Sequence, residues 1–171
     1  IVQLLMIRLY AHSTDDTRDI ATAIAMLVRA SDMIVLIGEM GSGKTTFSQH
    51  FAHALGVTEP VTSPTFNLLH NYVGGRLQLH HADLYRLERT GELDDLGLTE
   101  LQEAGGVMLV EWGDVVGDAL GTGLIVKLAV PDNAASEDSV TVRQIEIDWR
   151  GMQWETRWDK LRSSLSNWAT S

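Results

Sequence analysis

The sequence predicts a three-layer α/β fold with a mainly parallel central sheet, and two observations support this prediction. First, residues 33–38 (MIVLIG) and 106–112 (GVMLVEW) are short apolar runs, which are typical of strands buried on both faces of a parallel sheet. Second, segments with helical periodicity separate the predicted strands. The length of 171 residues fits one domain with a hydrophobic core, so we expect a single domain over residues 1–171.

The first predicted strand covers residues 2–8. It lies in an apolar opening that is too short to span a bilayer and lacks a basic leader and a small-residue cleavage site. A helix is predicted over residues 12–28. Ser13 or Thr14 can cap this helix, because a hydroxyl accepts hydrogen bonds from N–H groups of the first turn. The apolar face of the helix comprises Ile20, Ile24, Leu27 and Val28.

A second helix is predicted over residues 44–55, directly after the first apolar run. It ends at Gly56, a residue type that favours helix termination. Residues 66–85 alternate between apolar and polar side chains. This alternation predicts a β-hairpin, and the pair Gly74-Gly75 suits a two-residue turn between its strands.

The C-terminal part of the chain is predicted to add two more strands and a helix. The strands cover residues 123–130 and 139–149, with a polar loop between them. The apolar face of the last helix comprises Trp154, Trp158, Leu161 and Leu165. The pattern after about residue 130 assigns no function to this part of the chain.

The composition narrows the class of protein. There is no cysteine, so disulfides and thiolate metal sites are excluded, which suits a reducing compartment, and we expect a cytoplasmic protein. The formal net charge is −10. A protein that binds RNA by itself normally has a basic face that neutralises phosphates. We therefore expect any nucleic acid to be contacted through a partner.

One stretch of the sequence predicts a nucleotide site. Gly38, Gly43, Lys44 and Thr45 fit the phosphate-binding pattern G-x-x-x-x-G-K-[ST], between a predicted strand and a predicted helix. Glycines allow the backbone to curl so that its N–H groups point at a phosphate, and the helix directs its positive end to the same point. Residues expected to bind the nucleotide are Met40, Gly41, Ser42, Gly43, Lys44, Thr45 and Thr46.

Two carboxylates complete the predicted site. Glu111 ends the second apolar run, where a nucleotide-binding fold needs a carboxylate for Mg²⁺ alongside Thr45. Asp83 lies on a mostly apolar strand face, so it needs a partner. It could pair with Arg86 or Arg89, position the attacking water, or hold Mg²⁺ through water. The adjacent histidines 80 and 81 point to opposite faces of a strand, so we expect no zinc site there.

Four segments together resemble one protein family. They are GEMGSGKTTF (38–47), SPTF (63–66), HADLYRL (81–87) and LVEWGD (109–114). Their order and spacing are similar to the TsaE (YjeE) family, the bacterial ATPase of tRNA threonylcarbamoyladenosine (t6A) biosynthesis, over roughly residues 13–114. The resemblance implies a small P-loop NTPase-like protein that uses ATP and Mg²⁺. It also implies two ASKHA-fold partners of the TsaB and TsaD type, one of which modifies adenosine 37 of tRNA, with ATP hydrolysis resetting the transfer complex.

The resemblance also implies roles for individual residues. By position, Lys44 contacts phosphate, and Thr45 and Glu111 bind Mg²⁺. Thr65 lies in a switch-like segment, and Asp83 is needed for activity. Trp112 follows the metal ligand, and the nucleotide base lies near Thr14. The expected catalytic residues are Lys44, Asp83 and Thr65.

Three other functions use a similar loop. A small-molecule kinase needs an acceptor pocket and an arginine-bearing lid. Arg86 and Arg89 lie in an acidic segment without an evident acceptor-binding cluster. A GTPase needs an N/T-K-x-D motif, which the sequence lacks, so we expect ATP to be preferred to GTP. In a pure binding module the nucleotide would only stabilise an interface, but Asp83 and Glu111 beside a complete phosphate loop favour hydrolysis.

Overall fold

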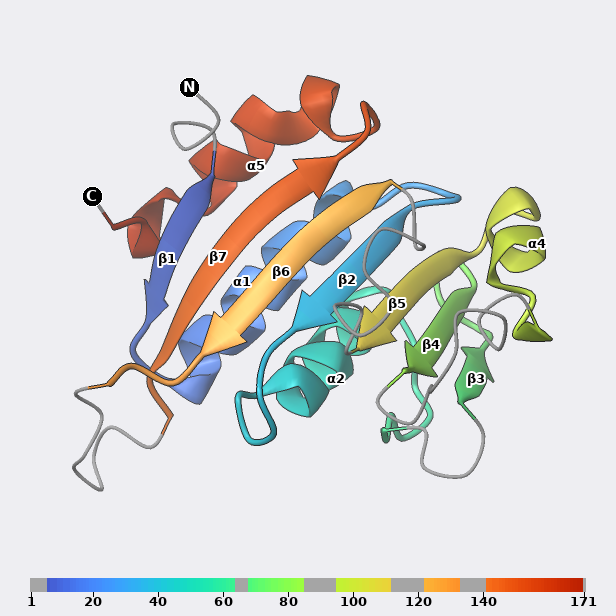
Figure 1. Ribbon diagram of the computed structural model, residues 1–171, viewed down its shortest axis with the longest axis horizontal. Helices are drawn as coiled ribbons and strands as arrows, with labels where there is room; N and C mark the ends of the chain where they lie inside the picture. Colours follow the sequence, from blue (N-terminus) through green and yellow to red (C-terminus); the bar gives the residue numbers. More distant parts are fainter. Residues whose placement is uncertain (1–5, 64–67, 85–94, 112–121, 133–140, 171) are drawn as a thin grey trace.

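The computed structural model describes residues 6–63, 68–84, 95–111, 122–132 and 141–170 (Figure 1). Its strands are β1 (Ile7–Ala11), β2 (Met33–Ile37), β3 (Leu69–Tyr72), β4 (Leu79–Asp83), β5 (Val107–Glu111), β6 (Gly123–Ala129) and β7 (Arg143–Arg150). Its helices are α1 (Thr14–Leu27), α2 (Lys44–Ala54), α4 (Leu98–Glu103) and α5 (Trp158–Ser164), with 3₁₀ turns at Glu155–Arg157 and Ser166–Trp168. None of these helices is both long and apolar enough to cross a membrane.

The strands form one sheet in the order β1-β7-β6-β2-β5-β4-β3. The four strands β6, β2, β5 and β4 are parallel neighbours, and β7 and β3 run antiparallel to them on either side. Strand β1 is antiparallel to β7 and so points the same way as the central four. The prediction of a mainly parallel sheet is confirmed, and the carboxyl ends of β2, β4 and β5 meet at one edge.

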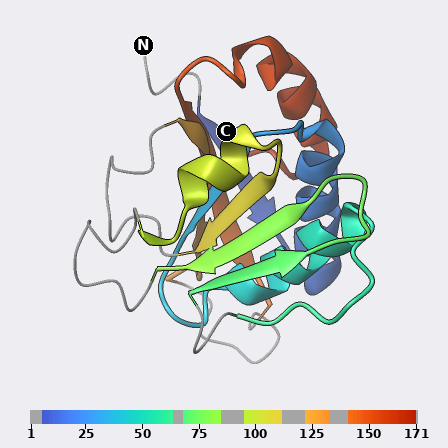
Figure 2. The same cartoon turned by 90° about the vertical axis from the view of Figure 1, so that its right-hand side faces the viewer.

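The strands β2, β4 and β5 are buried on both faces, as the apolar runs predicted for β2 and β5, whereas β1, β6 and β7 alternate between buried and more exposed residues. Ile34 and Leu36 of β2 belong to a core that includes residues of α1, α2 and α5, whereas Met33 and Val35 pack with Leu98 of α4 on the other face. Figure 2 shows α4 on the opposite side of the sheet from α1 and α2. The fold therefore has three layers.

The hairpin forms, but its turn differs from the prediction. Strands β3 and β4 pair from Leu69 to Ala82, and residues 73–78 connect them, so Gly74-Gly75 is not a two-residue turn. The connection is held by contacts that a local pattern does not reveal. The backbone N–H of Arg76 donates to Leu55 O (2.6 Å), and its guanidinium donates to carbonyls at the end of α1. The loop is therefore shaped by the ends of two helices.

The ends of the predicted helices and strands are close to the observed ones. The Oγ of Ser13 accepts from the N–H of Asp16 (3.2 Å), so the predicted cap of α1 is confirmed. Gly56 follows the last turn of α2 with φ +94°, the left-handed conformation that ends helices. The first strand continues to Ala11, three residues past the predicted end at residue 8, because β7 pairs with it along this length.

The C-terminal segment packs onto α1. Its four predicted apolar residues are all buried, although Trp154 precedes the helix rather than lying in it. Arg157 reaches the turn after α1, where its guanidinium makes a two-pronged ion pair with Asp32 at 2.6 and 2.9 Å. It also donates to Leu27 O (2.9 Å) and lies 3.9 Å over the ring of Trp154. This ion pair joins the end of the chain to the start of β2.

Candidate functional site: a phosphate loop and a buried carboxylate

The glycine-rich loop connects β2 to α2 at the carboxyl edge of the sheet. Gly41 and Gly43 have φ of +82° and +102°, a region that glycine occupies without strain. Gly38 is required for another reason, because a Cβ at this position would lie 2.4 Å from Ser42 Oγ and 2.6 Å from Leu128 O. Of the two glycines in the sequence pattern, Gly43 therefore permits a left-handed backbone conformation, and Gly38 permits the close approach of Ser42 and Leu128.

Lys44 is the first residue of α2 and is only 6 % exposed. Its ammonium folds back over the loop and donates to Gly38 O (2.6 Å) and Glu39 O (2.9 Å). A positive charge thus lies inside the curl of the loop, at the N-terminus of a helix, where the helix dipole also favours an anion.

A pocket of about 370 Å³ opens beside the loop. The residues that line it are Met40, Gly41, Gly43, Lys44, Thr45, Thr46, Ser63, Asp83, Glu111 and Arg143. Most of the predicted nucleotide residues and both predicted carboxylates are therefore brought together. Ser42 is buried behind the loop, and Thr14 is an exposed residue at the start of α1 that does not line the pocket. Predicted residues outside the described ranges are Thr65, Arg86, Arg89 and Trp112.

The carboxylate of Glu111 is almost fully buried, with 1 % exposure. Ser48 Oγ lies 3.0 Å from Oε1, Ser63 Oγ donates to Oε2 (3.0 Å), and His81 Nε2 lies 3.4 Å from Oε2. Burial acts to raise the pKa of Glu111, but His81 and the two serine hydroxyls outweigh it, so the pKa lies below its usual value. The group is therefore held as an anion.

The oxygen atoms around Glu111 suit a hard divalent cation. Thr45 Oγ1 lies 3.3 Å from Ser63 Oγ, which in turn donates to Glu111, so one serine links the two predicted metal ligands. Asp83 ends β4 beside Glu111, because the two residues are paired in the parallel register of β4 and β5. Hydroxyl and carboxylate oxygens are the donors that Mg²⁺ prefers, so this donor set fits the expected ion.

The two histidines of β4 lie on opposite faces of the sheet. His81 faces Glu111, whereas His80 Nδ1 lies 2.6 Å from Asn71 Oδ1 on β3. No cluster of three or more His, Cys, Asp or Glu side chains that could hold a metal ion occurs within the described ranges.

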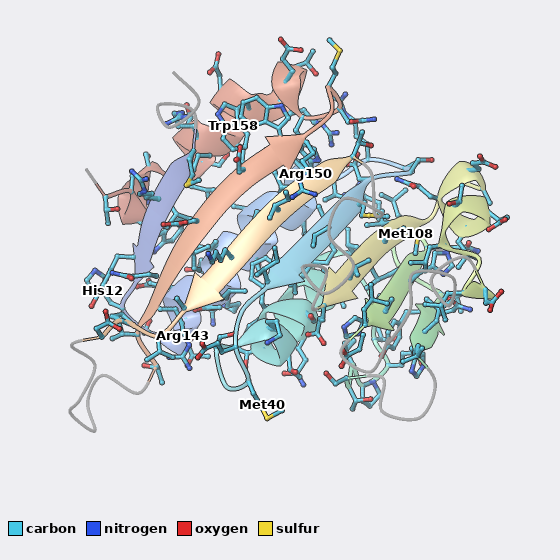
Figure 3. All side chains as sticks on the ribbon, in the orientation of Figure 1. His12, Met40, Met108, Arg143, Arg150 and Trp158 are labelled. Atoms are coloured by element: carbon cyan, nitrogen blue, oxygen red, sulfur yellow. The ribbon has the colours of Figure 1, made fainter. Side chains whose placement is uncertain are left out.

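Sequence reasoning missed three contributors: Ser48, Ser63 and Arg143. Ser48 lies one helical turn after Lys44, so its approach to the site follows from helical spacing. Ser63 begins the SPTF segment that was singled out for Thr65. Arg143 starts β7 about 100 residues from the loop, and no sequence signal indicates it. Figure 3 shows Arg143 at the same end of the sheet as Met40 of the loop.

Comparisons with known proteins identify similar chains. A family model described as "Threonylcarbamoyl adenosine biosynthesis protein TsaE" matches residues 11–141. A Bacillus subtilis protein named tRNA threonylcarbamoyladenosine biosynthesis protein TsaE is 42% identical over 106 residues, which are 62% of this chain and 66% of that protein. A Streptomyces coelicolor protein of the same name is 35% identical over 142 residues, which are 81% of this chain and 94% of that protein.

A solved structure has the same fold. The crystal structure of Bacillus subtilis YdiB matches with a TM-score of 0.72 and 30% sequence identity, covering 95% of both chains. Because the match extends over nearly the whole of both chains, the two proteins share the α/β fold.

Proposed function

The chain belongs to the TsaE family, and we propose that it is a Mg²⁺-dependent P-loop ATPase that supports t6A biosynthesis in tRNA. It hydrolyses ATP to reset a partner transferase between turnovers. The proposal rests chiefly on one observation: the lysine of the phosphate loop and a buried, anionic glutamate face the same pocket. A loop that binds phosphate and a carboxylate that binds a metal ion are the two parts that nucleotide hydrolysis needs.

Each residue of the pocket has a role in this proposal. Lys44 binds the terminal phosphates and stabilises the charge that develops on them. Thr45 and Glu111 would hold Mg²⁺, which neutralises phosphate charge when bound. Asp83 accepts a hydrogen bond from the attacking water and orients it. Thr65 remains the predicted residue of the switch-like segment.

The net charge and the family both support a role in which this chain acts on tRNA through partner proteins. The names of the relatives place those proteins in t6A biosynthesis. With a net charge of −10, this chain is poorly suited to capture tRNA by itself, because affinity for RNA comes mainly from Lys and Arg contacts with phosphate. We therefore place it beside two ASKHA-fold partners of the TsaB and TsaD type, which hold the tRNA. The switch that couples them is a segment that senses the γ-phosphate.

The first experiment measures ATP binding by calorimetry and ATP hydrolysis by phosphate release. Lys44→Ala should weaken ATP binding about ten- to a hundredfold, since a charge-assisted hydrogen bond contributes about 1.5–3 kcal/mol, and should abolish hydrolysis. Lys160→Ala is the matched control, because Lys160 is exposed on α5. Equal hydrolysis by the wild type and by Lys44→Ala would contradict the proposal.

The second experiment reconstitutes threonylcarbamoyl transfer with the two partner proteins and tRNA. Multiple turnovers should require both this chain and ATP, and Lys44→Ala should permit little beyond one turnover. Turnover that is unchanged without this chain would contradict the resetting role. Tight binding of tRNA to the isolated chain at physiological salt would contradict the indirect contact.

A further inference from the structure

We propose that Arg143 is a positioning residue of the nucleotide site, whose guanidinium holds the phosphate loop in the shape that binds phosphate. The inference rests on the proposed nucleotide binding. It concerns a residue outside the stretch 11–141 that the family model matches.

The guanidinium of Arg143 makes hydrogen bonds with the backbone of the loop. Its Nε donates to Ser42 O (2.8 Å), and one terminal nitrogen donates to Gly41 O (3.3 Å). The other terminal nitrogen donates to Val142 O (2.7 Å), which ties the guanidinium to its own strand. The Nε atom lies only 3.4 Å from where a Cβ on Gly43 would be. The guanidinium therefore lies against residues 41–43 of the loop.

The loop needs such a support because of its composition. A curl that directs N–H groups inward leaves carbonyl groups on its outer side, and these require donors. Glycines such as Gly41 and Gly43 adopt many conformations, so ordering them has a large entropic cost. Lys44 holds the carbonyls of the first two loop residues, and Arg143 holds those of Gly41 and Ser42. Two cationic side chains thus donate hydrogen bonds to the backbone carbonyls of one loop.

Arg143 is suited to this role by its position and by its shape. It is the first residue of β7, where it pairs with Ala11 of β1. Its backbone is therefore fixed in the sheet. A guanidinium is a planar fork with several N–H donors in fixed directions, so it can hold two carbonyls at once, which a lysine ammonium on a flexible stem does less well. Arg143 also lines the pocket, so it adds positive charge to the site.

The test compares Arg143→Ala and Arg143→Lys with the wild type. Arg143→Ala should raise the Kd for ATP and for ADP, and the KM for ATP, about ten- to a hundredfold, with kcat changed less than about threefold, because the loop binds ground state and transition state alike. Arg143→Lys should recover part of the affinity. The matched control is Arg150→Ala, at the far end of the same strand (Figure 3), which should bind ATP as the wild type does.

Two further measurements separate positioning from a general effect on folding. Without nucleotide, Arg143→Ala should have the same thermal midpoint as the wild type to within about 2 °C. Guanidinium ion at low millimolar concentration should restore ATP binding to Arg143→Ala and should not restore it to Lys44→Ala. ATP binding by Arg143→Ala at the wild-type Kd, or a loss matched by a large fall in the thermal midpoint, overturns the inference. Failure of the wild type itself to bind ATP overturns the proposed function instead, and the inference with it.

Discussion

The hydroxyl oxygen of Ser48 lies 3.0 Å from Oε1 of Glu111, so the helix that follows the phosphate loop is linked to the end of β5. The same hydroxyl lies 2.8 Å from the carbonyl of Lys44. The other oxygen of Glu111 accepts from Ser63. Both carboxylate oxygens are therefore oriented by neighbours from different parts of the chain, as expected for a side chain that is positioned to hold a metal ion.

Replacing Glu111 by Gln should separate nucleotide binding from hydrolysis. The amide keeps the size of the side chain but removes the negative charge, so we expect kcat in the presence of Mg²⁺ to fall about a hundredfold or more. ATP binding measured with EDTA should change little, because the loop and Lys44 are intact. Glu100→Gln on α4, where the side chain is exposed, is the control. Hydrolysis at the wild-type rate by Glu111→Gln would show that Glu111 is not the metal ligand.

Replacing Asp83 by Asn should lower kcat more than it lowers ATP affinity. Asp83 lies beside Glu111 in the register of the sheet and lines the pocket from β4, not from the loop. A group that orients water contributes mainly to the transition state, so we expect kcat to fall about a hundredfold while the Kd changes less than threefold. Stopped-flow hydrolysis and calorimetry measure the two quantities, with Asp95→Asn as the control. Equal losses in both would assign Asp83 a structural role.

The stability of the fold should decrease as the pH falls below about 6.5, in part because of His80. Burial lowers the pKa of His80 from its ordinary value of 6.5. The unfolded chain therefore binds a proton at a higher pH than the folded chain does. By linkage, the stabilising contribution is complete above pH 6.5 and is lost as the pH falls from there through the lower pKa of the folded state.

The measurement is the free energy of unfolding in urea at several pH values between 7.5 and 5. His80→Gln should flatten the decline, since glutamine does not titrate and its amide can still donate to Asn71 Oδ1. His53→Gln, an exposed position on α2, should leave the decline as it is in the wild type. A decline that is unchanged in His80→Gln would contradict the prediction.

Replacing Arg157 by Met should destabilise the protein by about 3–5 kcal/mol, because it leaves the buried carboxylate of Asp32 without its charged partner. Adding Asp32→Asn to this variant should recover part of the loss, since the uncompensated charge is then removed. Urea unfolding measures both. Arg29→Met, at an exposed position near the same turn, is the control. A loss below about 1 kcal/mol, typical of a surface ion pair, would contradict this prediction.

Much of the site was predictable because its residues lie close together in the sequence. The phosphate loop binds through consecutive backbone groups, so its chemistry requires particular residue types at fixed spacing, which a sequence displays. Glu111 was predicted because a phosphate loop needs a carboxylate at the end of a neighbouring strand, and Glu111 ends the second apolar run. The cap of α1 at Ser13 was predictable since capping involves only neighbours in the chain.

The parts that were missed depend on contacts between distant segments. Alternation along β7 indicates which face Arg143 occupies, but not that Gly41 and Ser42 lie next to it. The connection of the hairpin was predicted as a tight turn because Gly-Gly is a strong local signal. The observed connection is longer and is held by a tertiary hydrogen bond from the N–H of Arg76 to Leu55 O, which the local pattern does not indicate. Both errors have the same cause, since periodicity carries no information about which elements become neighbours.

The place of β1 in the sheet determines when this strand can pair while the chain is being synthesised. The hydrogen-bonding neighbours of β1 are β7 on one side and residues 169–170 on the other, where Thr170 N–H donates to Arg8 O. A ribosome makes β1 before the other strands of this sheet, and roughly 130 further residues must follow before Arg143 can pair with Ala11. At about 5–20 residues per second this takes on the order of ten seconds. Throughout that interval the nascent chain carries an unpaired strand with the apolar residues Ile7 and Leu9, a natural target for chaperones that bind extended segments as they emerge.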